Sequence, residues 1–157
     1  MTPTDSGERR WLGEVLTREI PLGGAMQLEV ARLDERGIEL SAPLAPNAND
    51  KGTAFGGALV SLMILAGWSL PRLLLRRGGL KADLVIGRCE VRFLAPVGRD
   101  FRVRCDWPEV DATRAFIERL RESGRGRLQL EPRVVDRDEV AARLQARYAA
   151  LAPPSES

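Results

Sequence analysis

Hydrophobic and polar residues alternate in several stretches of this chain, and one longer stretch is apolar on nearly every side. Met26–Leu33 and Ile38–Ala42 alternate with a period of two on either side of Asp34–Gly37, which predicts a β-hairpin closed by a turn. Gly56–Pro71 is apolar almost throughout, which predicts a helix that other elements enclose. Because its last residue has no N–H to donate, we expect a kink or a stop there, with Leu73–Leu75 as a last turn or two.

A long strand is predicted over Ala82–Leu94, because apolar and charged residues alternate there with the period of a strand. The face expected to lie on the helix holds Val85, Gly87, Cys89, Val91 and Phe93, and the other face holds Arg88, Glu90 and Arg92. A returning strand at Phe101–Trp107 would then place Cys89 roughly opposite Cys105. We expect two buried thiols there rather than a disulfide.

The remaining segments are less regular. Glu8–Ile20 predicts a short amphipathic helix that Gly23–Gly24 ends. Val110–Glu122 predicts another helix, and Arg127–Asp136 a strand that is bulged or at an edge where its proline falls. Val140–Leu151 is ambiguous, because its apolar residues fit the period of a strand and that of a helix, while its alanines favour a helix.

Length and composition fit one globular domain over residues 1–157, with flexible tails at 1–7 and 152–157. Of the 157 residues, 44% are hydrophobic and 29% charged, enough to bury a core. The net charge is +2 and the arginines are scattered among nearly as many acids, which disfavours nucleic-acid binding. No basic and apolar leader opens the chain, so we expect a cytoplasmic protein. Polar residues interrupt the apolar run Gly56–Leu75, so we predict no membrane span.

The chain contains no histidine and only two cysteines. A zinc site of the usual ligands and a Ser-His-Asp triad both require residues that are missing here. We therefore predict no metal and no cofactor.

The candidate chemistry is concentrated in the loop Pro46–Phe55 and the helix start that follows it. Two amides, Asn47 and Asn49, precede the glycine pair Gly56–Gly57. Glycines at a helix start leave the first N–H groups approachable, and the helix dipole there favours partial negative charge, such as the oxygen of a polarised carbonyl. Each feature also has a purely structural explanation, because the amides can cap the loop and the glycines can permit close packing.

This loop and two later segments resemble a known family. Leu44–Gly57, together with Leu65–Trp68 and Arg92–Val97, resembles the thioesterase family typified by the C-terminal domain of the bacterial YiiD acetyltransferase. The likeness extends from about Trp11 to Leu151. It implies an α+β hotdog fold, in which a long curved antiparallel sheet wraps around one central apolar helix. In that fold two strands, the helix and four strands follow one another, so the ambiguous last segment becomes a strand.

The resemblance also assigns roles to loop residues. The spacing from Asn49 to Gly57 is similar to a pattern of acyl-CoA thioesterases, in which an amide and the N–H of the second glycine orient the thioester carbonyl. By position, Asn49 and Gly57 are the catalytic candidates. Phe55 stands where those enzymes have histidine, and Ile64 where they have the aspartate that activates water. The candidates for substrate binding are Asn47, Lys51, Thr53, Phe55, Gly56 and Ser61, of which Lys51 is also typical of a solvated surface and Ser61 lacks a base to make it a nucleophile.

The implied function is hydrolysis of a fatty acyl thioester carried on coenzyme A (acyl-CoA) or on acyl carrier protein (acyl-ACP), with the acyl tail in an apolar slot beside the helix. Because the helix carboxylate is missing, two alternatives stay open: a non-catalytic module that binds acyl thioesters or mediates dimerisation, and a structural assembly protein. A sheet wrapped on one helix leaves the strand at Asp83–Leu94 as an open edge, so we expect a homodimer or a dimer of dimers.

Overall fold

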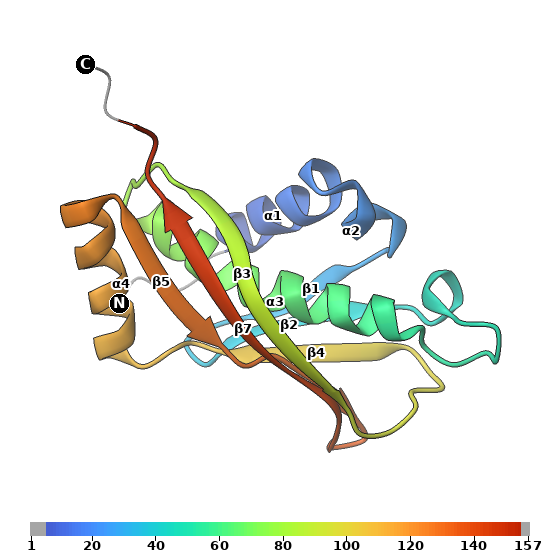
Figure 1. The fold of residues 1–157 in the computed structure, drawn as a ribbon. Coiled ribbons are helices and arrows are strands. Elements are labelled where there is room, and N and C mark those ends of the chain that lie inside the picture. The colour runs from blue at the N-terminus through green and yellow to red at the C-terminus, as the bar shows by residue number, and fades with distance from the viewer. Residues whose placement is uncertain (1–5, 155–157) are drawn as a thin grey trace.

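The computed structural model describes residues 6–154 and shows one antiparallel sheet curved around one long helix (Figure 1). The elements in chain order are α1 (Ser6–Glu14), a π-helical turn (Val15–Glu19), α2 (Pro21–Ala25), β1 (Glu29–Leu33), β2 (Gly37–Ala42), a 3-10 turn (Ala45–Asn47), α3 (Gly56–Arg77), β3 (Asp83–Phe93), β4 (Phe101–Asp106), α4 (Val110–Ser123), β5 (Arg125–Leu130), β6 (Arg133–Asp136) and β7 (Glu139–Leu151). The strands follow the order β1-β2-β4-β6-β7-β3, and β5 pairs with the far end of β7. This is the hotdog arrangement that the resemblance implies.

The central helix α3 is enclosed by the sheet, and Tyr148 of β7 donates a hydrogen bond to the carbonyl of Ile64 at 2.7 Å. The helix does not stop at Pro71, which was one of the two predicted outcomes, because it continues to Arg77. Leu73 and Leu75 beyond the proline are fully buried. Burial of two leucines contributes about 3–6 kcal/mol, which offsets the roughly 3 kcal/mol that a proline costs inside a helix. The helix is long and apolar enough to cross a membrane, but 67% of its most apolar window is buried inside the fold.

The segment before the hairpin is more helical than expected. The helix predicted at Glu8–Ile20 is present as α1 and the π-helical turn, although residues 6 and 7, assigned to a flexible tail, belong to α1. The break predicted at Gly23–Gly24 is wrong, because both glycines lie within α2. A Cβ on Gly23 would lie 1.8 Å from the carbonyl oxygen of Leu16. The glycine therefore lets α2 fold back against the preceding turn.

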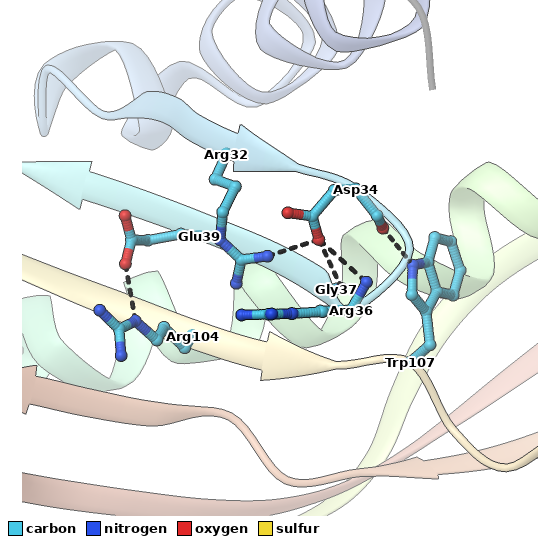
Figure 2. A network of polar contacts seen from close by, with 7 residues as sticks. All are labelled: Arg32, Asp34, Arg36, Gly37, Glu39, Arg104 and Trp107. Atoms are coloured by element: carbon cyan, nitrogen blue, oxygen red, sulfur yellow. Dashed lines mark hydrogen bonds and ion pairs between the residues drawn. The ribbon is translucent and has the colours of Figure 1, made fainter. Parts of the chain in front are cut away.

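The predicted hairpin is confirmed as β1 and β2, and Asp34 organises its turn (Figure 2). Its carboxylate accepts hydrogen bonds from the N–H groups of Arg36 at 2.9 Å and Gly37 at 3.3 Å, and its carbonyl accepts one from the Trp107 indole at 2.8 Å. Burial on its own raises the pKa of Asp34, but hydrogen bonds from Arg32 and from the two backbone N–H groups outweigh it and leave the pKa below its ordinary value.

The long predicted strand is present as β3, but a β-bulge changes which residues share a face. Ile86 pairs with Tyr148, whereas Arg88 pairs with Arg147, so Gly87 is the extra residue. The residues opposite the buried positions of β7 are therefore Leu84, Ile86, Cys89, Val91 and Phe93, and the face predicted from strict alternation is wrong before the bulge. Because β3 is the last strand of the sheet, this apolar face stays largely exposed rather than covered by the helix.

The predicted position of Cys89 opposite Cys105 on an adjacent strand is also wrong. β4 pairs with β2 and β6, so Cys105 lies beside Ile38, while Cys89 lies beside Ala146. Both thiols are free; Cys105 is buried as expected, but Cys89 is exposed. Burial, followed by the neighbouring Asp106 carboxylate, raises the pKa of the Cys105 thiol to about 12.

The C-terminal third corrects one prediction and resolves another. The predicted helix is present as α4, which Gly124 ends in a left-handed conformation. The strand predicted at Arg127–Asp136 is interrupted at Glu131–Pro132 and forms β5 and β6, so five strands rather than four follow α3. The ambiguous Val140–Leu151 lies within β7, a strand. Ala152, assigned to a flexible tail, donates its N–H to the Gly124 carbonyl at 2.8 Å.

Candidate functional site

The loop before α3 is held by its own hydrogen bonds, and Asn49 provides most of them. The Asn49 side-chain oxygen accepts the N–H groups of Lys51 at 2.8 Å and Thr53 at 3.1 Å, and its amide nitrogen donates to the Thr53 hydroxyl at 2.8 Å. The backbone N–H of Asn49 donates to the Thr53 carbonyl at 2.7 Å. Lys51 is exposed, with its ammonium 3.4 Å from the Asp50 carboxylate. Asn49 therefore acts on its own loop in this conformation.

Asn47 connects three parts of the chain around the start of α3. It is only 5% exposed, and its amide nitrogen donates to the carbonyls of Met26 at 3.0 Å and Pro43 at 2.8 Å. Its own carbonyl accepts the N–H of Phe55 at 2.8 Å. Both amide hydrogens of Asn47 are thereby used for structure, and the side chain fixes the end of α2 to the loop.

The first turn of α3 presents free backbone donors. The Phe55 carbonyl accepts the N–H groups of Ala58 at 2.9 Å and Leu59 at 3.1 Å, but the N–H groups of Gly56 and Gly57 have no acceptor among residues 6–154. Gly57 is exposed. The helix dipole adds to the partial positive charge at these groups.

Two aromatic rings flank this glycine pair. A Cβ on Gly57 would lie 2.4 Å from the ring of Phe55, and a Cβ on Gly56 would lie 3.5 Å from the ring of Phe93 on β3. The two phenylalanines are 57% and 53% exposed. Glycine at position 57 therefore lets the Phe55 ring lie directly over the backbone while the N–H remains open.

A cavity of about 320 Å³ opens beside this helix start. Its lining residues come from α2 and the turn after it, from the loop, and from the first turns of α3: Leu22, Ala25, Met26, Pro46, Asn47, Ala48, Phe55, Gly57, Ala58 and Ser61. The cavity brings together four of the residues predicted from the sequence, namely Asn47, Phe55, Gly57 and Ser61. It does not include Asn49, Lys51, Thr53 or Gly56.

The wall contributed by α2 was missed by sequence reasoning. Leu22 and Met26 flank Gly23–Gly24, a glycine pair that ordinarily marks the end of a helix. Apolar residues on both sides of that pair were the available signal. Larger hollows lie elsewhere, one of about 650 Å³ between β4, α4 and β7 and one of about 750 Å³ beside Trp68. We place the candidate site at the smaller cavity because Gly57, whose N–H has no acceptor among residues 6–154, lines it.

This cavity can hold a polarised carbonyl and an apolar chain, but one copy of the chain does not supply a base. The Gly57 N–H is available to a carbonyl oxygen, and the walls at Leu22 and Met26 are apolar. No lining residue in the described part of the chain is titratable. Ser61 therefore has no neighbouring base within the cavity that could make it a nucleophile.

Comparisons with known proteins agree with the observed fold. A family model described as "Putative thioesterase (yiiD_Cterm)" matches residues 9–152. A solved structure of a Chlorobaculum tepidum protein of unknown function is 25% identical, with 92% of this chain and 94% of that chain covered and a TM-score of 0.87. A "putative thioesterase" from Shewanella oneidensis is 24% identical, with 94% and 99% covered and a TM-score of 0.85. A Pseudomonas aeruginosa protein described as a "Probable Thioesterase" is 22% identical, with 97% and 99% covered and a TM-score of 0.77.

Proposed function

This chain belongs to the thioesterase family typified by the YiiD C-terminal domain, and on that premise we propose that it hydrolyses an acyl thioester carried on coenzyme A or on acyl carrier protein. The observation that supports this most directly is that Gly57, whose N–H has no acceptor among residues 6–154, lines a largely apolar cavity. A donor in that position stabilises the negative charge that develops on the thioester oxygen when water attacks.

The proposed binding mode follows from the cavity walls. The carbonyl oxygen lies at the Gly57 N–H, the acyl chain runs along Leu22 and Met26, and the carrier stays outside, past the exposed ring of Phe55. Ser61 lies one helical turn beyond Gly57 and lines the same cavity, so its hydroxyl is a candidate for contact with the substrate.

The group that activates water must come from outside the cavity. Within one chain, Asp50 is the acid closest in sequence, and it is exposed beside Lys51. A second copy is the other source, with Glu90 on its exposed edge strand β3 as the candidate. We therefore include a homodimer in the proposal, or a dimer of dimers. A cytoplasmic setting and the absence of a nucleic-acid partner stay predictions.

The open edge of the sheet supports the dimer. Among the described strands, none lies beside β3 on one side, and four large apolar residues on or next to β3 are exposed: Val85 (44%), Ile86 (37%), Phe93 (53%) and Leu94 (50%). Exposed apolar edges promote pairing with another chain. Pairing of two β3 strands would cover this surface and extend the sheet from one copy into the next.

One observation favours a second candidate function. Because no titratable side chain of the described residues lines the cavity, the site fits a non-catalytic module that binds acyl thioesters. Binding and turnover separate the two functions. Release of free thiol from acyl-CoA of different chain lengths and from acyl-ACP measures hydrolysis, while calorimetry with a non-hydrolysable thioether analogue measures binding alone.

The decisive variants alter the backbone donor itself. Gly57→Pro removes the N–H in the first turn of the helix, where proline is tolerated, and Gly57→Ala keeps it while adding a comparable Cβ. We expect kcat for Gly57→Pro to fall by about 10²–10³ relative to Gly57→Ala. Equal turnover of the two folded variants would remove Gly57 from the mechanism.

Asn49 is the other catalytic candidate, and its loop bonds provide a competing explanation. A catalytic amide predicts a loss of about 10²–10³ in kcat for Asn49→Ala. A loop role predicts a loss of about 0.5–1.5 kcal/mol in the free energy of unfolding, with turnover almost unchanged. Measuring kcat and the melting temperature on the same sample decides between them.

A further inference from the structure

A row of basic residues crosses the outer face of the sheet. Side by side from β1 to β3 lie five arginines and one glutamate: Arg32, Glu39, Arg104, Arg133, Arg143 and Arg92. These positions alternate with buried residues such as Leu40, Val103 and Val134, so their side chains stand on the face away from α3. We call this set the basic row.

No described helix covers the basic row. α3 packs on the inner face, and α4 packs on the inner side of β5, where a Cβ on Gly126 would lie 2.5 Å from the carbonyl oxygen of Phe116. α1 meets β1 from the inner side, where a Cβ on Gly13 would lie 4.0 Å from the side chain of the buried Val30. The row is most accessible toward β3, where Arg92 and Arg143 are exposed, whereas Glu39 nearer the other end is buried.

The charge of the row is compensated at one end only. Toward β1, Arg104 forms an ion pair with Glu39 at 2.7 Å and Arg133 one with Asp106 at 3.3 Å. Figure 2 shows Arg32 and Arg104 directed to Asp34 and Glu39 on this part of the face.

Toward β3 the charges of the arginines are no longer compensated by ion pairs. Arg92 and Arg143 lie directly opposite each other, as do Arg88 and Arg147 four residues along the same strands. None of these four arginines has an ion-pair partner within residues 6–154. Like charges directly opposite one another repel, so this end of the row has an unbalanced positive potential that attracts anions.

The uncompensated end lies next to the candidate site. Arg92 precedes Phe93, whose ring approaches Gly56 at the start of α3. A partner bound to Arg92 and Arg143 is therefore at the sheet edge whose Phe93 approaches the start of α3, next to the cavity-lining Gly57. On the basis of the proposed function, we propose that the basic row docks an acidic helix of the carrier protein that delivers the acyl thioester.

The spacing of the row suits carboxylates on a helix. Neighbouring strands lie about 4.8 Å apart, so Arg133 and Arg92, two strands apart, are separated by roughly 10 Å. Acids at positions i and i+7 of a helix are separated by about 10.5 Å along its axis. Arginine also binds carboxylates with two parallel hydrogen bonds. The same face also holds Glu39 and Glu90. Their negative charges favour a protein partner that has some basic residues over a continuous polyphosphate.

The test compares three double variants in binding to an acylated acyl carrier protein with an acidic docking helix. The first variant, Arg92→Glu with Arg143→Glu, reverses the uncompensated charges. The second, Arg92→Lys with Arg143→Lys, keeps them. The third, Arg10→Glu with Arg114→Glu, makes the same change of net charge as the first, but on the exposed faces of α1 and α4. We expect at least about tenfold weaker binding for the first, and near wild-type binding for the other two. Binding should also weaken with added salt.

The outcomes separate this docking surface from the proposed hydrolysis. If the carrier binds in an Arg92- and Arg143-dependent way but no thioester is cleaved, the docking surface stands and the hydrolysis is wrong. If acyl-CoA is cleaved while the carrier binds equally well to all variants, the docking surface is wrong. Tighter binding of a duplex RNA than of the carrier would also overturn it. Circular dichroism confirms the fold of each variant, and Arg143→Gln alone, with an expected intermediate loss of affinity, serves if the double reversal does not fold.

Discussion

Replacement of Asn47 tests whether the cavity depends on the join between α2 and the loop. Both hydrogens of the Asn47 amide donate to backbone carbonyls, those of Met26 at 3.0 Å and Pro43 at 2.8 Å, and the side chain is 5% exposed. Asn47→Ala removes both donors together. Asn47→Asp keeps the shape but replaces the donor with an oxygen, which repels the two carbonyls.

The expected cost follows from these two bonds. A protein hydrogen bond contributes about 0.5–1.5 kcal/mol net, and a buried carbonyl left without a partner costs about 1–3 kcal/mol. The Met26 bond is buried and the Pro43 bond is partly buried. We therefore expect Asn47→Ala to lower the free energy of unfolding by about 2–4 kcal/mol. For a chain of this size that lowers Tm by roughly 5–15 °C.

Thermal and urea unfolding measure this loss, with Asn49→Ala as the matched control. Asn49 is half-buried and bonds only within its own loop, so we expect a smaller shift of a few degrees, at about 0.5–1.5 kcal/mol. Asn47→Asp should be less stable than Asn47→Ala. If Asn47→Ala lowers Tm no more than Asn49→Ala does, the buried amide does not hold α2 in place.

Three further predictions rest on other parts of the fold. A thiol reagent should label Cys89 before Cys105, which should react only after unfolding, because Cys89 is exposed on a single copy of the chain whereas Cys105 is buried with its pKa raised to about 12; equally fast labelling of the two thiols in the folded state would contradict this. Ile86→Asp should give a monomer in light scattering, because it puts a charge in the exposed apolar edge of β3; an unchanged mass would show that this edge is not the interface. The pKa of Asp34 is lowered in the folded state, so its carboxylate stabilises the fold above a pH of about 4, and this contribution is lost as the pH falls through the lowered value. The stability difference between wild type and Asp34→Asn in urea unfolding should shrink over that range, and a constant difference would contradict it.

The elements that could be predicted from the sequence are those with a long and unbroken pattern. The hairpin and α4 each have a regular period and α3 has a long apolar run, each with a turn or glycine at its ends, and all three are present. The family resemblance identified β7 as a strand, because its pattern alone fits the period of a strand and that of a helix. Periodicity identified the hairpin and α4 because the alternation of buried and exposed positions is set by the local geometry of the backbone.

The errors arose where one residue changes the meaning of the pattern. The extra residue at Gly87 shifts the period of β3 by one position, so every side chain before it changes face. Gly23 permits a close approach to Leu16 instead of ending a helix. Both effects depend on what lies across from the glycine in space, which the order of residues along the chain does not contain. The same holds for the cavity, because its α2 wall is fixed by Asn47 across the fold.

β3 carries two surfaces that suit different partners, and their common strand couples them. Its inward residues form an apolar edge that suits a second copy, while its outward Arg88 and Arg92 belong to an uncompensated basic face. If two β3 edges pair, the basic faces of both copies meet, and their repulsion weakens the dimer. An acidic carrier that neutralises those arginines removes the repulsion, so carrier binding and dimerisation should strengthen each other by the same factor. Sedimentation at low salt with and without the carrier measures this effect, and an identical dimer dissociation constant in both would show that the two surfaces act independently.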